Sequence, residues 1–195
     1  VRADSNIQTL DDLSGHTVSI GAEESGTERN ATQILEFAGM PSSLVATKNL
    51  DYIEATKELK AGDIDAFFCT AGLTTTVIDE LSKECDIRLI PLTDTVISKM
   101  LESSSAYTSE VIPAGTYTGQ DTAISTIGVK SVLITKSDVS DDTIEQLTSL
   151  LFEKENELSY SNSLKLELTY DFATDGIPIP FHNGAKRYYE DCGYS

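Results

Sequence analysis

Hydrophobic positions along the chain alternate between short apolar runs and helical stripes. Residues 17–21 form a compact apolar run that stops at a glycine, and residues 25–38 then carry apolar side chains at helical spacing. The same alternation continues, with strands predicted at 44–46, 64–69 and 87–91 and helices at about 51–61, 73–81 and 93–104. This βαβα order predicts an α/β fold, in which helices flank a mainly parallel sheet over about residues 17–112.

The pattern changes in the last part of the chain. A turn-rich stretch at 112–119 ends the alternation, and residues 123–135 predict one long strand, broken near Gly128. Helices are then predicted through Ile144, Leu147, Leu151 and Leu158, through Leu164 and Leu168, and from about His182 to Cys192. We therefore expect four parts: an entry segment (1–16), an α/β lobe (17–122), a connecting strand (123–137) and a separate helical segment (138–195).

Charge narrows the possible partners. The chain has 14 Lys and Arg against 32 Asp and Glu, a net charge of −18. A nucleic-acid binder needs a basic face that displaces counterions, so no nucleic-acid partner is expected, and docking on an anionic membrane surface is disfavoured for the same reason. The 39% of hydrophobic residues fall in periodic blocks, which predicts a folded chain. No apolar run approaches the length of about 18 residues that a membrane-spanning helix needs.

The first candidate site is Ser25-Gly26-Thr27, between a predicted strand and a predicted helix. A helix start has unpaired N–H groups and the positive end of the helix dipole, and the two hydroxyls add donors. This combination favours binding of a carboxylate or phosphate. The alternative is an ordinary N-cap in a tight turn. The segment lacks the Gly-Lys-Ser/Thr of a phosphate-binding loop and the spaced glycines of a dinucleotide site.

A second candidate is Thr70-Ala71-Gly72, which follows the predicted 64–69 strand. Ligands of open α/β sheets bind outside the carboxyl ends of strands, where small residues leave room. The alternative is a strand-to-helix turn with a helix cap. Tyr117, in the turn-rich stretch, could present its ring and hydroxyl to the same site, or could be an exposed turn tyrosine.

Support for catalysis is weak. His16 and His182 lie outside any nucleophile elbow or metal-ligand motif. The three cysteines (Cys69, Cys85 and Cys192) lack metal spacing and allow at most one intramolecular disulfide. We expect no catalytic residues, no metal site and no cofactor.

Four blocks of sequence together resemble one family, the TAXI group of solute receptors, which are the extracytoplasmic subunits of TRAP transporters. The blocks are 7–15 with 18–21 and 25–27; 62–68; 112–117; and 179–185 with 188–190 and Gly193. The chain departs from the family pattern at Asn183, where proline is common. It also lacks most of the first lobe, including the glycine-rich ligand loop.

The resemblance implies a type II periplasmic-binding-protein-like fold that comprises the complete second lobe and C-terminal helices of an incomplete first lobe. Residues 1–3 and the predicted 123–135 strand would then be hinge strands, which fits a processed chain that begins without Met. The implied function is capture of a small anionic solute, such as an amino acid or organic acid, for delivery to TRAP membrane subunits outside the cytoplasm. Ser25, Gly26 and Thr27 would hold its carboxylate, Thr70, Ala71 and Gly72 would form a neighbouring wall, and Tyr117 would close one side. The alternatives are a sensing module of a membrane signalling receptor with the same fold and, with less support, an enzyme on this scaffold.

Overall fold

The computed structural model describes residues 1–153 and 168–193. The predicted helical positions Leu158 and Leu164 lie outside the described residues. The chain divides into two compact units, Val1–Gly128 and Val129–Ser195. Each unit is described below by itself.

The centre of the first unit is a sheet of three parallel strands in the order β2-β1-β3. These strands are β1 (Thr17–Ser19), β2 (Ala46–Lys48) and β3 (Ala66–Phe67). Val18 pairs with Thr47 on one side and with Ala66 on the other, and its side chain is fully buried. The predicted α/β fold class, a parallel sheet flanked by helices, is confirmed.

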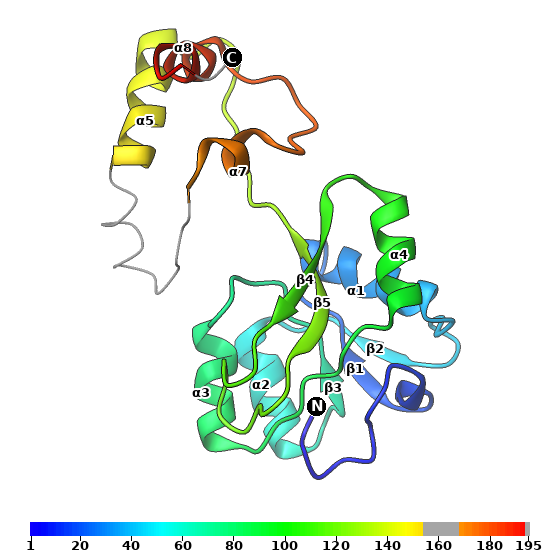
Figure 1. The fold of residues 1–195 in the computed structure, drawn as a ribbon. Helices are drawn as coiled ribbons and strands as arrows, with labels where there is room; N and C mark the ends of the chain where they lie inside the picture. Colours follow the sequence, from blue (N-terminus) through cyan, green and yellow to red (C-terminus); the bar gives the residue numbers. More distant parts are fainter. Residues whose placement is uncertain (154–167, 194–195) are drawn as a thin grey trace. The chain divides into compact units, whose positions relative to one another are not determined.

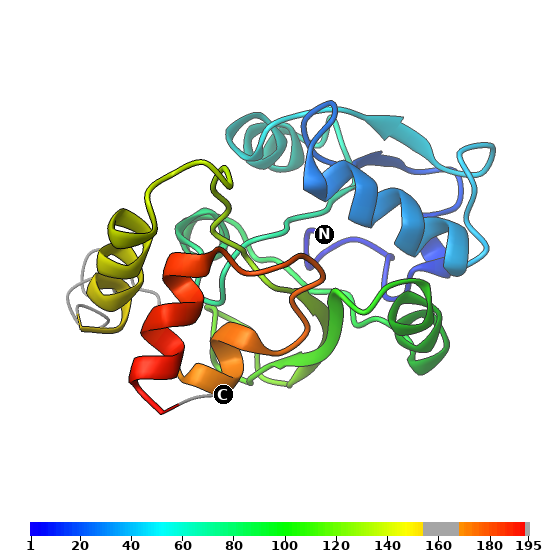
Figure 2. The same ribbon diagram turned by 90° about the horizontal axis from the view of Figure 1, so that it is seen from above.

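Two pairs of helices flank the sheet of this unit (Figure 1 and Figure 2). Each pair packs on a hydrophobic core of its own. In the larger core, α1 (Gly26–Phe37) and α4 (Asp94–Ser103) pack against Val18 and Ile20. In the smaller core, α2 (Tyr52–Ala61) and α3 (Thr76–Glu84) pack around Ile64 and Phe67. Burial of these apolar side chains stabilises the helices, which are too short to be stable alone in water.

The helices begin and end at residues that local sequence dictates. The Ser25 hydroxyl accepts a hydrogen bond from the Glu28 N–H at the start of α1, and the Asp51 carboxylate accepts one from the Glu54 N–H at the start of α2. Gly62 ends α2 with a φ of 81°, a left-handed conformation that favours glycine. The four helices predicted between residues 25 and 104 are therefore confirmed, with ends shifted by a few residues.

The strand predictions are less accurate. A second, two-stranded sheet pairs β4 (Tyr107–Ile112), which the sequence pattern did not predict, with β5 (Ile124–Val129). The long strand predicted over 123–135 was wrong beyond Val129. β5 ends there, and within the described residues no strand pairs with residues 130–135. The strand predicted over 87–91 was also wrong, since the segment forms one antiparallel bridge, Arg2 with Ile87, rather than a ladder.

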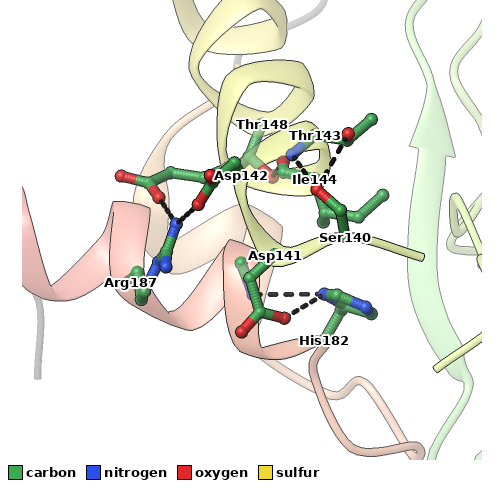
Figure 3. Close-up of polar contacts among 10 residues, drawn as sticks. Ser140, Asp141, Asp142, Thr143, Ile144, Thr148, His182 and Arg187 are labelled. Atoms are coloured by element: carbon green, nitrogen blue, oxygen red, sulfur yellow. Dashed lines mark hydrogen bonds and ion pairs between the residues drawn. The ribbon is translucent and has the colours of Figure 1, made fainter. Parts of the chain in front are cut away.

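The second unit contains α5 (Asp141–Glu153), α7 (Tyr170–Thr174) and α8 (Asn183–Asp191). α5 and α8 pack closely at Gly184, where a Cβ atom would lie 2.2 Å from the Asp141 carbonyl oxygen. Figure 3 shows the polar contacts between these helices: the Arg187 guanidinium bonds to the Asp142 and Glu145 carboxylates, and His182 Nδ1 lies 3.7 Å from Asp141. The final helix predicted over about 182–192 is confirmed as α8.

Candidate functional site

Three loops of the first unit share one edge of its sheet. The three strands are parallel neighbours, so the segments that follow their carboxyl ends must emerge at the same edge. These segments are 20–25 after β1, 49–51 after β2 and 68–75 after β3. Two of them contain residues predicted to bind a ligand.

The first loop places the start of α1 against Gly21. Gly21 has a φ of 102°, and a Cβ atom there would lie 2.7 Å from Thr27 Cβ and 3.0 Å from Ser25 Oγ. Ser25 Oγ accepts the Glu28 N–H at 3.1 Å, and no described residue accepts the Ser25 hydroxyl proton. The N–H groups of Gly26 and Thr27 are in the first turn, where a helix supplies no carbonyl partner. Ser25, Gly26 and Thr27 therefore provide three donors for an anion.

Thr27 and Thr70 are brought together by Tyr52, the first residue of α2. The Tyr52 hydroxyl lies 2.7 Å from Thr27 Oγ1, donates to the Thr70 carbonyl oxygen at 2.8 Å and accepts the Thr70 N–H at 3.2 Å. Thr27 is only 5% exposed, so its hydroxyl is part of this internal network. Tyr52 thereby links the first loop to the third.

The third loop is exposed on its outer side. Thr70, Ala71 and Gly72 are all exposed, and the Thr70 hydroxyl accepts a hydrogen bond from the Asn30 side chain of α1 at 3.3 Å. Asn30 accepts in turn from the Tyr107 hydroxyl at 2.8 Å. The network of Thr27, Tyr52 and Thr70 thus continues to β4.

Tyr117, in the turn-rich stretch after β4, is buried, and its hydroxyl contacts the residue before the start of α3. Its hydroxyl accepts the Thr75 N–H at 3.3 Å, and among the described residues no hydrogen bond joins it to Ser25, Gly26 or Thr27. It also lines a hollow of about 590 Å³, together with Gln8, Arg88 and Gln120 among others. The structure therefore associates Tyr117 with the 68–75 loop through Thr75, and separately with this hollow.

Burial raises the pKa of two titratable groups near the third loop, Cys69 and Tyr117. Desolvation raises the pKa of the Cys69 thiol to about 11, although a hydrogen bond with Tyr52 acts in the opposite direction. Desolvation likewise raises the pKa of the Tyr117 hydroxyl. Both groups are therefore neutral near pH 7, and Cys69 is a poor nucleophile because the thiolate is the reactive form.

An acidic side chain also lies at the start of α1. The Glu28 carboxylate accepts the Glu24 N–H at 2.6 Å and the Asn49 amide at 2.8 Å. Its negative charge already interacts favourably with the helix dipole. An anion at this site would therefore be held mainly by the N–H and hydroxyl donors and would be repelled by Glu28.

Sequence reasoning missed Tyr52 and Asn49. Both follow the short strand β2, and Asn49 donates to the Gly21 carbonyl oxygen at 3.1 Å. A usable signal was present, because a third parallel strand must bring its own carboxyl end to the same edge. The pattern placed that strand at 44–46, but the loop after it was not considered for binding.

The part of the chain that the structure describes contains no group of three His, Cys, Asp or Glu residues that could hold a metal ion. Cys69, Cys85 and Cys192 are free thiols. Within the same described residues, every helix is too short or too polar to cross a membrane.

Comparison with known proteins places the chain in a family. A solved structure that is similar to the chain is the periplasmic aliphatic sulphonate binding protein SsuA from Escherichia coli, at 15% sequence identity and a TM-score of 0.49. The similarity covers 100% of this chain and 60% of that one, so the chain spans less than two thirds of the length of that protein. The model of the NMT1-like family matches residues 1–193. Because this match extends over almost all of the 195 residues, the chain belongs to the NMT1-like family.

Proposed function

We propose that the chain is part of an extracytoplasmic solute receptor that captures a small carboxylate ligand, such as an amino acid or organic acid. The observation that carries this proposal is the convergence of Ser25, Gly26 and Thr27 with Thr70 through the Tyr52 hydroxyl. The convergence supports one site rather than two unrelated turns. Its free donors are N–H groups and a hydroxyl, which suit a carboxylate.

The finer assignment rests on the resemblance of the four sequence blocks to TAXI receptors. In that assignment residues 17–122 are the complete second lobe, which binds the ligand, and 138–195 belong to the first lobe, which the chain contains in part. The receptor would deliver its ligand to the membrane subunits of a TRAP-type transporter. Ala71, Gly72 and Tyr117 would border the ligand.

The test is calorimetry on the receptor, after a thermal-shift screen of amino acids and organic acids has identified a ligand. The double variant Ser25→Ala/Thr27→Ala removes one free hydroxyl donor and the hydroxyl that bonds to Tyr52, so affinity should fall. Thr93→Ala is a matched control, because it removes the N-cap hydrogen bond of α4 without touching the proposed site. Unchanged affinity in the double variant would contradict the assignment of this site.

Glu28→Gln adds an outcome in the opposite direction. The substitution removes the negative charge at the start of α1. It replaces one of the two carboxylate oxygens, so the remaining amide oxygen keeps the hydrogen bond from Asn49 and the bond from the Glu24 N–H is lost. Affinity for a carboxylate should therefore rise. A neutral ligand would show no such increase, so this variant separates an anion site from a site for uncharged solutes.

The second candidate is a sensing module of a membrane signalling receptor with the same fold. Its ligand site would be the same, so binding data do not separate the two functions. Transport reconstituted with TRAP membrane subunits does: ligand uptake that depends on the receptor supports the first function, and binding without uptake favours the second.

A further inference from the structure

The Tyr52 hydroxyl makes hydrogen bonds to both of the segments that contain the predicted ligand contacts. It bonds to Thr27 at the start of α1 and to both backbone groups of Thr70. Among the described residues, no other side chain makes hydrogen bonds both to residues 20–27 and to residues 68–72. The pairing of β1 with β3 and the hydrogen bond from Asn30 to Thr70 bring the two loops close together. The Tyr52 hydroxyl adds the direct bridge between the first turn of α1 and residues 68–72.

A tyrosine hydroxyl has one proton, and the Thr70 carbonyl oxygen is only an acceptor, so Tyr52 is the donor in its bond to Thr70. In the Thr27–Tyr52 contact of 2.7 Å either hydroxyl can be the donor. While Tyr52 donates to Thr70, Thr27 is the donor to Tyr52, and the Thr27 hydroxyl proton is then not available to a ligand.

This assignment changes the role of Thr27 within the proposed site. The residue is 5% exposed, and its hydroxyl is engaged in the contact with Tyr52. The donors that remain for an anion are the Ser25 hydroxyl and the N–H groups of Gly26 and Thr27. Tyr52 holds these donors in register with the third loop, because it fixes the side chain of Thr27 directly.

We propose that Tyr52 is a positioning residue for the anion site: its hydroxyl joins Thr27 to Thr70 and so fixes the first turn of α1 relative to the 68–72 loop. This inference rests on the proposed function, since it concerns the same site. The inference adds Tyr52 to the proposed site as a residue that does not contact the ligand and acts by holding the two loops in place.

The experiment uses amide NMR on the isotope-labelled chain, with sodium acetate as the smallest carboxylate probe and sodium chloride at matched ionic strength as its reference. The variants are Tyr52→Phe and the control Tyr107→Phe. The control removes a hydroxyl that bonds to Asn30 and Gln33 on α1. Within the described part of the chain, this hydroxyl makes no hydrogen bond to either loop and is connected to Thr70 only through the Asn30 side chain. Thr27→Val is a second variant that breaks the same contact from the other side and nearly preserves the side-chain shape.

Without acetate, Tyr52→Phe should speed hydrogen exchange at the Thr70 amide and shift the signals of Gly26 and Thr27, whereas Tyr107→Phe should leave all three close to wild type. With acetate, the wild-type chain and Tyr107→Phe should show the same shifts at Gly26 and Thr27. In Thr27→Val, which removes the hydrogen bond between Thr27 and Tyr52, the dissociation constant should rise by roughly fivefold, the value expected for one lost hydrogen bond. Tyr52→Phe also removes both hydrogen bonds to Thr70 and should raise the dissociation constant at least as much. The double variant should bind acetate little more weakly than Tyr52→Phe alone, because Thr27→Val removes a contact that Tyr52→Phe has already removed.

Two negative results have different meanings. Acetate binding by Tyr52→Phe and Thr27→Val at wild-type strength overturns the positioning role while leaving the anion site intact. Absence of acetate-dependent shifts at Gly26 and Thr27 in the wild-type chain overturns the proposed site itself, and with it the role of Tyr52. If Tyr52→Phe fails to fold, the acetate affinity of Thr27→Val tests the positioning role instead, and an affinity equal to that of the wild type overturns it.

Discussion

Gly21 shows how one residue determines the geometry of the candidate site. Its left-handed backbone turns the chain from β1 into α1, and its missing side chain lets Thr27 pack within the space of a methyl group. Both properties require glycine at this position. Two other glycines of the same unit allow the backbone conformation and the close approach to be tested separately. Gly15 has a φ of 80° with open space around it, and Gly26 has neither constraint.

We predict a graded series of stabilities for Gly26→Ala, Gly15→Ala and Gly21→Ala. Gly26→Ala should cost nothing, since alanine favours helix. Gly15→Ala should cost about 1 kcal/mol from backbone strain alone. Gly21→Ala should cost about 3 kcal/mol, because overlap with Thr27 adds to the strain. Urea unfolding measures the series, and equal stabilities for Gly15→Ala and Gly21→Ala would show that the close approach to Thr27 is unimportant.

Cys69 makes the stability of the fold dependent on pH in the alkaline range. Burial raises the pKa of its thiol from 9.0 to about 11. Between these values the unfolded chain loses the thiol proton and the folded chain keeps it, so the unfolded state binds fewer protons and stability falls as pH rises. Below pH 9 both states are protonated and the effect vanishes.

The measurement is urea unfolding of the reduced wild type, Cys69→Ala and Cys192→Ala between pH 8 and about 10.5. The wild type and the control variant Cys192→Ala, in which an exposed thiol is removed, should lose more stability over this range than Cys69→Ala. Parallel pH profiles for the wild type and Cys69→Ala would contradict the burial of this thiol.

At the scale of elements, the sequence predicted helices better than strands, for a physical reason. A helix satisfies its own backbone, so a cap and an apolar stripe such as Ser25 with Ala31 and Ile34 suffice to locate it. A strand needs a partner that lies elsewhere in the sequence. The apolar run at 87–91 makes only a single bridge, and β5 ends at Val129 although apolar residues continue.

The candidate site follows the same rule. Ser25, Gly26, Thr27 and Thr70 were predicted because they follow apolar runs that resemble strand ends. Tyr52 was missed because its contacts are 25 residues away at Thr27 and 18 residues away at Thr70. Such separations cannot be seen in local periodicity, and only the order of the parallel strands could have indicated them.

The pairing of α5 with α8 depends on backbone contact at Gly184. A Cβ atom there would lie 2.2 Å from the Asp141 carbonyl oxygen and 2.9 Å from the Glu145 nitrogen. Because both neighbours are backbone atoms, they cannot move without displacing α5. We predict that Gly184→Ala destabilises this helix pair by about 2–3 kcal/mol, as overpacking of a tight contact does.

Amide hydrogen exchange on α5 and α8 measures this effect. Lys186→Ala, at an exposed position of α8, is the matched control and should leave exchange close to wild type. Equal protection of α5 in Gly184→Ala and in the wild type would show that the two helices are not held together at this point.

At the scale of the whole molecule, the net charge of −18 and the proposed anion site are compatible. Distant surface charges are screened within about 8 Å at physiological ionic strength, so a ligand at the start of α1 responds mainly to nearby groups. Glu28 is the acidic residue in the first turn of α1. The donors of Ser25, Gly26 and Thr27 act over a few ångströms. The acidic surplus therefore argues against polyanion partners and does not exclude a small carboxylate.

The extent of the site predicts how strongly this chain binds by itself. Ligand sites of proteins bury roughly 70–90% of a small ligand. The loop residues Thr70, Ala71 and Gly72 are exposed. We therefore expect the 195-residue chain to bind the receptor's ligand with a dissociation constant of about a millimolar, or about −4 kcal/mol, because the ligand would keep much of its contact with water. Calorimetry on the chain and on the complete receptor measures the difference. Micromolar or tighter binding by the chain alone would mean that these loops already enclose the ligand, and that the proposed first lobe contributes little to affinity.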